Sequence, residues 1–361
     1  MKSRPKLLLS PEDIRPTLPN FRVRGVLNPG AVRLRDGKIM LYARIAETPK
    51  HGKRIFLAPR FSGTKRTKII IEEIPRSKGR LGPESFIMDN SIYRLPTISH
   101  FRKILLDESG MNVVEASTAM DFAGLSEDGD FGVEDARITH LRKEKLYAMT
   151  YVSVSMCSGV STSLALSRDL VEWERKGIIF RQQNKDAVIF PEKIGGMYAA
   201  LHRPEGTMIF DKPRIWISYS NDLEFWGRDR PILSPRDNSW DELRIGPGAV
   251  PLLTGEGWLA IYHGVRYVNR KRPEKGKVYS AGAMLLDAKN PERVIARTPE
   301  DEPLFGPKEY YERTGFVNSV VFPTAAIPDR DGKGLLIYSG AADSCIEVRK
   351  IGIKEILGSL V

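Results

Sequence analysis

A hairpin motif that recurs five times constrains the fold of this chain more than any other feature of its sequence. Each copy has a short strand of apolar or small residues, a turn, and a second apolar strand that ends in polar or aromatic residues. Turns such as RDGK and TGEG are typical of β-hairpins, because Gly and Asp accept the backbone conformations that tight turns require. The five copies occupy residues 28–44, 134–151, 186–204, 246–264 and 322–343.

A second unit follows most of the hairpins and consists of a strand, a polar turn with Asp, and another strand. It is clearest at residues 163–173 and 216–226. Each repeat therefore supplies about four antiparallel strands, which is the content of one propeller blade. We predict an all-β fold, a five-bladed β-propeller with four-stranded antiparallel blades around a central pocket, formed as a single domain by residues 1–361. A sandwich or a pair of barrels would not explain why the same two-part motif recurs.

The positive charge of the chain is concentrated in one segment. The formal net charge is +11, and residues 50–80 hold ten Lys or Arg and only two Glu, so +8 belongs to this segment. We interpret residues 49–100 as a basic insertion in the first blade. A solvated insertion is the simpler hypothesis, and an arm that attracts anions or contacts a neighbouring subunit of a homo-oligomer is the alternative. No nucleic-acid motif accompanies it, so no nucleic-acid partner is expected.

Other features narrow the class of protein further. No apolar run approaches the roughly 20 residues that cross a bilayer, and the first residues carry no signal-peptide cleavage site. We therefore expect a cytoplasmic protein that does not bind membranes. Cys157 and Cys345 cannot build a disulfide framework, and neither has metal-site spacing. We expect no metal and no organic cofactor.

The ends of the hairpin strands are unusually polar. In a propeller the innermost strands surround the central channel, so equivalent ends should ring one pocket, where a structural core would take apolar residues. For Arg137 an ion pair with Asp135 is the simpler interpretation, and His202 and His263 could each have a structural role. Arg203 is interpreted as shaping the turn after the third hairpin. The polar ends are Asn28, Arg44, Asp135, Arg137, Lys185, Asp186, His202, Arg244, His263 and Asp343.

Several segments resemble glycoside hydrolase family 130. They are GVEDARIT, KDAVIFPEKI with GGMYAALHRP, RIGPGAVPL with GWLAIYHGV, and SGAAD, and together they extend the resemblance over about residues 25–345. The family contains mannoside phosphorylases and related β-mannosidases built on a five-bladed propeller. The chain departs from the family at Ala136, where the family favours Pro, and in its longer, more basic insertion.

The resemblance implies a role for each polar residue. Asp135 would be the general acid, with a pKa raised by burial or by the bound sugar. Phosphate would be held by Lys185, Arg244, His263 and Tyr279. The mannosyl unit would be bound by Asn28, Arg44, Arg137, Asp186, His202 and Asp343.

The pocket also indicates which nucleophile is used. A hydrolase needs a second carboxylate to activate water, whereas phosphate is already an anion and needs cations to hold it. The predicted ring has more bases than carboxylates, which favours phosphate as co-substrate. We predict inverting phosphorolysis of β-1,2- or β-1,4-linked manno-oligosaccharides to α-mannose 1-phosphate and a shortened glycan. The alternatives are a β-mannosidase, with Glu242 or Glu192 facing the pocket, and a non-catalytic glycan-binding propeller.

Overall fold

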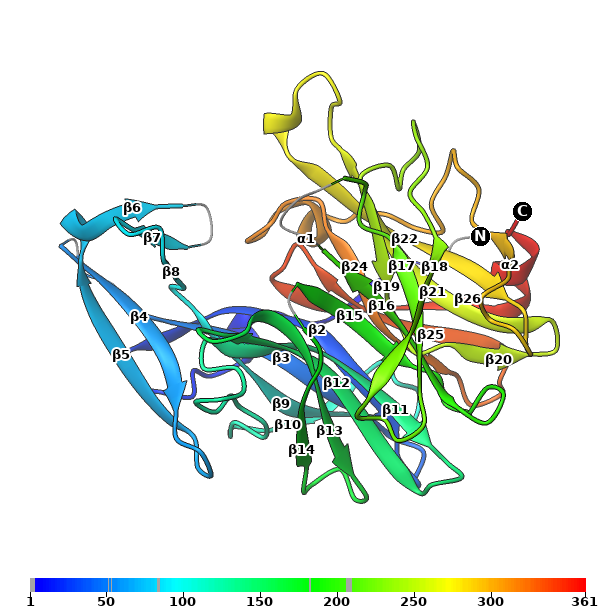
Figure 1. Ribbon diagram of the computed structural model, residues 1–361, viewed down its shortest axis with the longest axis horizontal. Helices are drawn as coiled ribbons and strands as arrows, with labels where there is room; N and C mark the ends of the chain where they lie inside the picture. Colours follow the sequence, from blue (N-terminus) through cyan, green and yellow to red (C-terminus); the bar gives the residue numbers. More distant parts are fainter. Residues whose placement is uncertain (1–3, 51, 53, 83–84, 182, 206–209) are drawn as a thin grey trace.

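The computed structural model describes residues 4–50, 52, 54–82, 85–181, 183–205 and 210–361. This part of the chain is almost entirely β-structure, which confirms the all-β prediction (Figure 1). Its helices are α1 (Tyr310–Arg313), α2 (Ile353–Gly358) and the 3-10 turns Pro11–Asp13, Arg76–Lys78 and Pro273–Lys275. None of these helices is long and apolar enough to span a membrane.

All five predicted hairpins are present as antiparallel strand pairs. Their strands are β2 (Phe21–Arg33) with β3 (Ile39–Pro49), β11 (Gly132–Leu141) with β12 (Leu146–Ser155), β15 (Asn184–Ile189) with β16 (Tyr198–Pro204), β19 (Arg244–Pro247) with β21 (Gly257–Tyr267), and β24 (Val321–Pro328) with β25 (Gly334–Ala341).

Outer strands extend each hairpin into a larger sheet. They are β9 (Ile98–Leu106), β10 (Val113–Ala116), β13 (Gly159–Ser167), β14 (Glu174–Phe180), β17 (Ile215–Ser220), β18 (Trp226–Leu233), β22 (Lys277–Leu286), β23 (Val294–Arg297) and β26 (Cys345–Gly352). The short strand β20 (Leu252–Thr254) follows β19 along the same edge of β21. The strand β1 (Lys6–Leu9) pairs with β26, so the start of the described chain completes the last sheet. The first two hairpins share one eight-stranded sheet, in which β9 and β11 are joined at the single parallel pair of Ser99 and Gly132.

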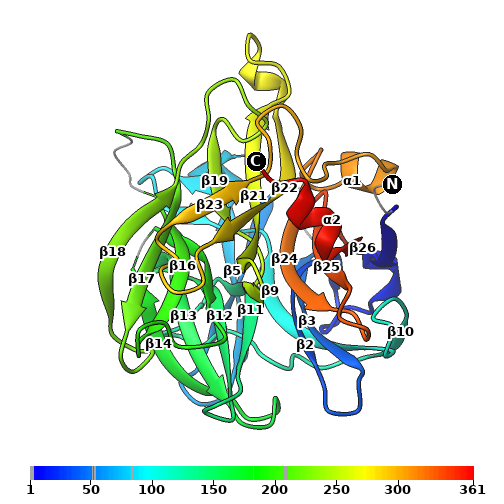
Figure 2. The same cartoon turned by 90° about the vertical axis from the view of Figure 1, so that its right-hand side faces the viewer.

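The first strands of the hairpins, which we call the inner strands, gather at the centre of the molecule (Figure 2). β2 contacts both β11 and β24, β11 contacts β15, and β15 contacts β19. β24 in turn contacts β21 and β22 of the fourth sheet, so the last sheet packs against both the fourth and the first. Polar groups at equivalent positions of the inner strands can therefore meet.

The segment between β3 and β9 projects from the body as an arm (Figure 1, left). It contains the hairpin of β4 (Ile55–Ser62) and β5 (Lys68–Pro75), followed by β6 (Gly79–Leu81), β7 (Phe86–Met88) and β8 (Tyr93–Arg94). β3 and β9 pair directly with each other, so the arm is inserted between two neighbouring strands.

A β-bulge interrupts four of the five inner strands at an equivalent level. The register shifts between Leu27 and Gly30, between Glu134 and Arg137, and at the corresponding places in β15 and β24. Asn28, Asp135 and Asp186 lie in three of these bulges with φ of 45°, 53° and 63°. Asn and Asp tolerate this left-handed conformation better than most residues. A bulge changes the direction of a side chain, and here it brings Asn28 within hydrogen-bond distance of Asp135.

A buried ionic network fixes the segment that leads into β24. Arg349 on β26 donates hydrogen bonds to Glu312 of α1 and, at 3.2 Å, to Glu347. Glu312 also accepts the backbone N–H groups of Lys308 and Glu309 at 2.5 and 2.6 Å. Burial raises the pKa of Glu347 to about 8, an effect that Arg349 opposes and Glu312 reinforces. Glu347 is therefore protonated in the folded protein at neutral pH.

We expect this proton to make stability depend on pH. The pKa of Glu347 is raised from about 4.5 to about 8 on folding. The proton on Glu347 therefore contributes fully to the free energy of unfolding below pH 4.5, and this contribution is lost as the pH rises through 8. The free energy of unfolding should fall by roughly 3 kcal/mol between pH 5 and 8 from this group alone. Urea denaturation at a series of pH values should show a flatter profile for Glu347→Gln. Equal slopes in both proteins would mean that Glu347 is ionised when folded.

Candidate functional site

The polar ends of the inner strands enclose a cavity of about 220 Å³. Eight of the eleven predicted site residues line it, and Arg203 and three apolar residues complete the wall. The lining residues are Asn28, Arg44, Asp135, Lys185, Arg203, Arg244, His263, Tyr279, Val317, Val320, Phe322 and Asp343.

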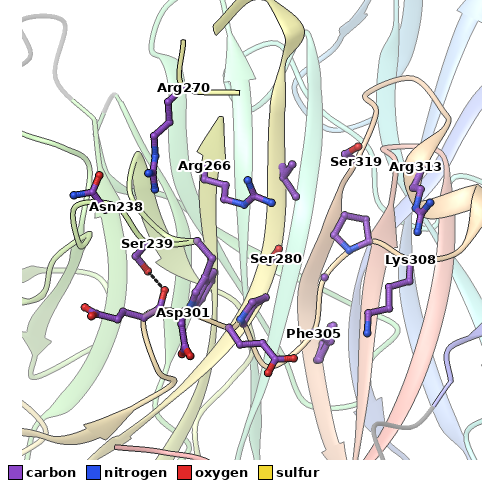
Figure 3. Close-up of a pocket in the computed structure, with 17 residues that line it drawn as sticks. Asn238, Ser239, Arg266, Arg270, Ser280, Asp301, Phe305, Lys308, Arg313 and Ser319 are labelled. Atoms are coloured by element: carbon purple, nitrogen blue, oxygen red, sulfur yellow. Dashed lines mark hydrogen bonds between the residues drawn. The ribbon is translucent and has the colours of Figure 1, made fainter. Parts of the chain in front are cut away.

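A larger cavity of about 520 Å³ lies on the other side of one wall (Figure 3). Val278, Ser280 and Ser319 line this larger cavity, whereas Tyr279 and Val320 line the smaller one, as expected for strands whose side chains alternate in direction. It contains none of the predicted residues, and its charges are of both signs: Arg266, Arg270, Lys308 and Arg313 with Glu300, Asp301 and Glu302. We place the site in the smaller cavity, because its ionisable groups are buried and held by one another.

Asp135 is held on one wall of the smaller cavity. Its Oδ1 accepts a hydrogen bond from Nδ2 of Asn28 at 2.8 Å and from Nη1 of Arg44 at 3.2 Å. Arg44 is fixed by further hydrogen bonds to Glu134 and Ser99 at 2.6 and 3.1 Å. Both hydrogen bonds to the Asp135 side chain end on Oδ1, so Oδ2 is the oxygen available to a ligand.

In the ligand-free protein burial does not raise the pKa of Asp135 above its ordinary value, and the alternative, a pKa raised by the bound sugar, stays a prediction. Burial alone would raise the pKa of this carboxyl, but the positive charges of Arg44, Lys185 and Arg137 and the hydrogen bond from Asn28 outweigh burial and lower it. Asp135 is therefore ionised at neutral pH when the cavity holds no ligand, and a role as proton donor requires a change in its surroundings.

Three cations face the cavity from β15, β16 and β19, and β15 contacts β11, the strand of Asp135. Lys185 begins the third hairpin, and Arg203 is its cross-strand partner on β16. Nε of Arg203 donates to Oδ2 of the fully buried Asp186 at 2.9 Å. Arg244 on β19 donates a hydrogen bond to the hydroxyl of Tyr279, and its guanidinium lies 5.4 Å from the centre of that ring. The carboxylate of Glu205 contacts both Arg203 and Arg244.

His263 is buried between these cations and is uncharged. Burial lowers its pKa to about 3, Asp186 opposes this, and the charges of Arg203 and Arg244 add to it. Neither ring nitrogen has a hydrogen-bond partner among the residues that the structure describes. The ring can therefore donate to a ligand or accept from one, but it is not one of the cations of the site.

Two predicted residues lie behind the lining. Nη1 of Arg137 donates to the backbone oxygen of Asp135 at 2.5 Å, and its Nε donates to Gly248. Arg137 thus holds the backbone at the bulge and does not form the predicted pair with the Asp135 carboxylate. Asp186 lies 3.5 Å from Arg137 and 3.8 Å from His263, and joins them to Arg203.

His202 does not reach the cavity. Its ring hydrogen-bonds to Asn184 at 2.8 Å and to Ser218 at 2.7 Å, and it stacks on Phe180 with ring centres 4.3 Å apart. Successive residues of a strand point to opposite faces, so Arg203 faces the cavity and the preceding His202 faces away. The structural interpretation of His202 fits this geometry, and its predicted contact with the sugar does not.

Glycines allow the site to close tightly at two places. A Cβ at Gly340 would lie 1.9 Å from Oδ1 of Asn28. A Cβ at Gly246 would lie 2.4 Å from the His263 ring and 2.7 Å from the Asp186 carboxylate. A larger residue at either position would displace a group that holds Asp135 or the cations.

Comparison with known proteins identifies the family. A sequence model described as beta-1,4-mannooligosaccharide phosphorylase matches residues 94–360. The chain belongs to glycoside hydrolase family 130.

Relatives in this family resemble the chain over 62–98% of its length. A β-1,2-mannobiose phosphorylase of Listeria innocua is 34% identical over 98% of this chain and 96% of its own length. The solved structure of a Listeria innocua β-1,2-mannobiose phosphorylase, in complex with β-1,2-mannobiose, superimposes with a TM-score of 0.86 and covers 98% of this chain and 96% of its own. A 1,2-β-oligomannan phosphorylase of a Thermoanaerobacter strain is 37% identical over 62% of this chain and 70% of its own.

The charge balance of this family 130 site differs from the predicted excess of bases. With Glu134 and Glu205 included, five carboxylates (Glu134, Asp135, Asp186, Glu205, Asp343) match five cations (Arg44, Arg137, Lys185, Arg203, Arg244) in and around the cavity. Both signs occur throughout the site, because Arg44 pairs with Asp135 and Glu134, and Arg203 pairs with Asp186 and Glu205.

The carboxylates named for a hydrolase do not line the cavity. Glu242 is buried and accepts a hydrogen bond from Arg270 at 2.6 Å. Glu192 is exposed in the turn between β15 and β16. Among the described residues, Asp135 and Asp343 are the carboxylates that line the cavity.

The neutral state of His263 can be tested by NMR. Because its pKa lies near 3, its imidazole resonances should not shift between pH 5 and 8 in the ligand-free protein. Assignment by comparison with His263→Gln identifies the signal. A titration with a midpoint near 6.5, the usual histidine value, would contradict the uncharged state that burial imposes.

Proposed function

We propose that this protein catalyses the inverting phosphorolysis of β-mannosides, with Asp135 as the general acid and inorganic phosphate as the nucleophile. The observation that carries the proposal is that one cavity is lined by Asp135 and by three cations, Lys185, Arg203 and Arg244. In-line displacement with inversion requires the acid and the nucleophile on opposite faces of the sugar. Guanidinium and ammonium groups suit a phosphate nucleophile.

Phosphate binding would also favour the protonated form of Asp135, which is the form that can act as general acid. Lys185 lowers the pKa of Asp135 in the ligand-free protein, together with Arg44 and Arg137. A phosphate dianion beside Lys185 and Arg244 offsets their charge, and a sugar in the cavity excludes water. Both changes favour the protonated carboxyl. Asp135 would thus acquire its proton when both substrates are bound, which couples the acid to the presence of the nucleophile.

The reaction then balances as a single displacement. A phosphate oxygen bonds to the anomeric carbon as the glycosidic C–O bond breaks, and the proton of Asp135 passes to the leaving oxygen. That transfer is direct or goes through a sugar hydroxyl, as the family resemblance implies. The products are α-mannose 1-phosphate and a glycan shortened by one unit. None of these steps calls for a metal or an organic cofactor.

The remaining lining residues would position the substrates. We assign Asn28, Arg44 and Asp343 to the mannosyl unit, and Arg203 joins Lys185, Arg244, His263 and Tyr279 around phosphate. Asp186 and Arg137 would act indirectly, by orienting Arg203 and the backbone of Asp135. The likeness to the Listeria innocua phosphorylase over nearly the whole chain makes a β-1,2-linkage the first candidate, with β-1,4-linked substrates second.

We also propose that the sheets form five blades of one propeller domain. The eight-stranded sheet would divide at the single pair of Ser99 and Gly132 into a blade of β2, β3, β9 and β10 and a blade of β11–β14. The contacts of β2 with both β11 and β24 support a closed ring. The arm at 49–100 would be an insertion in the first blade.

The decisive experiment is phosphate dependence. The protein is incubated with β-1,2- and β-1,4-mannobiose, with and without phosphate, and mannose 1-phosphate and free mannose are measured. We expect mannose 1-phosphate only when phosphate is present. Free mannose irrespective of phosphate would identify a mannosidase, and no turnover of either disaccharide would favour a glycan-binding protein.

A substitution tests the acid within the same assay. Asp135→Asn keeps the side-chain shape but cannot donate the proton, so turnover should fall by about 10²–10⁴-fold with an unchanged melting temperature. Glu192→Gln, at an exposed turn away from the cavity, is the matched control and should retain full activity. Substantial activity in Asp135→Asn would refute the assignment of the acid.

A further inference from the structure

Glu205 is a carboxylate that contacts the cationic side of the cavity and has no part in the reaction proposed above. It directly follows β16, and its backbone N–H donates to Gln183 at 2.8 Å. Its side chain forms ion pairs with Arg203 and with Nη1 of Arg244, the second at 3.5 Å. The Glu205 side chain is 20% exposed, whereas that of Arg203 is 3% exposed, so Glu205 occupies the more accessible side of the pair.

Several donors that phosphate would need are already engaged, whereas Nε of Arg244 has no hydrogen-bond partner among the described residues. Nε of Arg203 is bonded to Asp186, and Nη2 of Arg244 is bonded to the Tyr279 hydroxyl. The remaining contacts of the two guanidinium groups converge on Oε1 of Glu205. A bidentate contact between Arg244 and phosphate therefore competes directly with Glu205.

The two arginines also require an anion between them. Arg203 is fully buried and lies close enough to Arg244 for their like charges to interact unfavourably. In the absence of phosphate, Glu205 is the carboxylate that bridges both groups. It stabilises the empty site in the same way that phosphate would stabilise the filled one.

We propose that Glu205 is an internal counter-ion of the phosphate site, which bridges Arg203 and Arg244 when phosphate is absent and is displaced from Arg244 when phosphate binds. This inference rests on the proposed function. Any stabilisation that Glu205 gives to the empty site is lost on binding, so it weakens phosphate binding and eases release of the phosphorylated product.

The same competition gives the site selectivity among anions. A dianion such as phosphate interacts with Lys185, Arg203 and Arg244 about twice as strongly as a monoanion at the same distance. Chloride or nitrate cannot displace the carboxylate as readily. Glu205 thus acts as a specificity-determining residue that keeps common monoanions out of the nucleophile site.

The test compares Glu205→Gln with the wild-type protein. Phosphate affinity is measured by calorimetry and by the phosphate-induced shift in melting temperature without sugar, and kinetics are measured at saturating mannobiose. We expect the phosphate Kd and KM to fall by about 3–10-fold, the phosphate-induced shift to increase, and the KM for mannobiose to stay within twofold. Inhibition by chloride should become stronger.

Controls make each outcome decisive. Glu300→Gln changes an exposed glutamate of the neighbouring cavity and should leave phosphate affinity unchanged. If Glu205→Gln does not fold, Glu205→Asp shortens the side chain and should also lower the phosphate Kd, by a smaller factor.

Two outcomes would overturn the proposal. Unchanged phosphate affinity in Glu205→Gln would remove Glu205 from the site, and weaker phosphate binding would mean that it positions the arginines permanently. Neither outcome bears on the proposed function. The proposed function is tested separately, and it fails if the reaction of the wild-type protein does not depend on phosphate.

Discussion

The site depends on one backbone device, the β-bulge repeated in the inner strands. In a regular strand, alternate side chains would point into the packing between sheets, and the polar residues at this level would be buried without partners. The bulges, with Asn28, Asp135 and Asp186 in left-handed conformations, instead give Asn28 and Asp135 each other as partners and give Asp186 the partner Arg203. The close approach of Asn28 to Gly340 shows how tightly the neighbouring strand is fitted to this arrangement.

The meeting of three cations with one carboxylate in the same cavity makes this ring of polar groups a candidate reaction site. Cations lie on β15, β16 and β19, and the carboxylate that faces them is ionised while the cavity is empty. A bound phosphate would offset the cations and favour the protonated acid, so nucleophile and acid become competent together. Glu205 fits the same account, since buried cations without an anion are costly and the chain supplies a displaceable one.

Much of the fold and several site residues could be predicted from the sequence. Turns and strands depend on residues that are close together in the chain, so their signals can be read locally. The five hairpins, and Asp135 and Arg44 at their ends, followed from the repeat. His202 and Arg203 were assigned the wrong way round, since alternation allows only one of them to face the cavity and the register was not known. Pairing Lys185 with its cross-strand partner would have identified Arg203. Val317 and Val320 lie outside the repeat, and the lowered pKa of Asp135 depends on distances within one sheet and to a second sheet that carries Lys185.

The most direct test of the account is a crystal structure of the Asp135→Asn protein with phosphate and β-1,2-mannobiose bound. The account predicts phosphate against Lys185 and Arg244, Glu205 withdrawn from Arg244, and the glycosidic oxygen on the side of residue 135, with the anomeric carbon between them. Phosphate on the same face of the sugar as residue 135, or in the neighbouring cavity lined by Arg266 and Arg313, would contradict it.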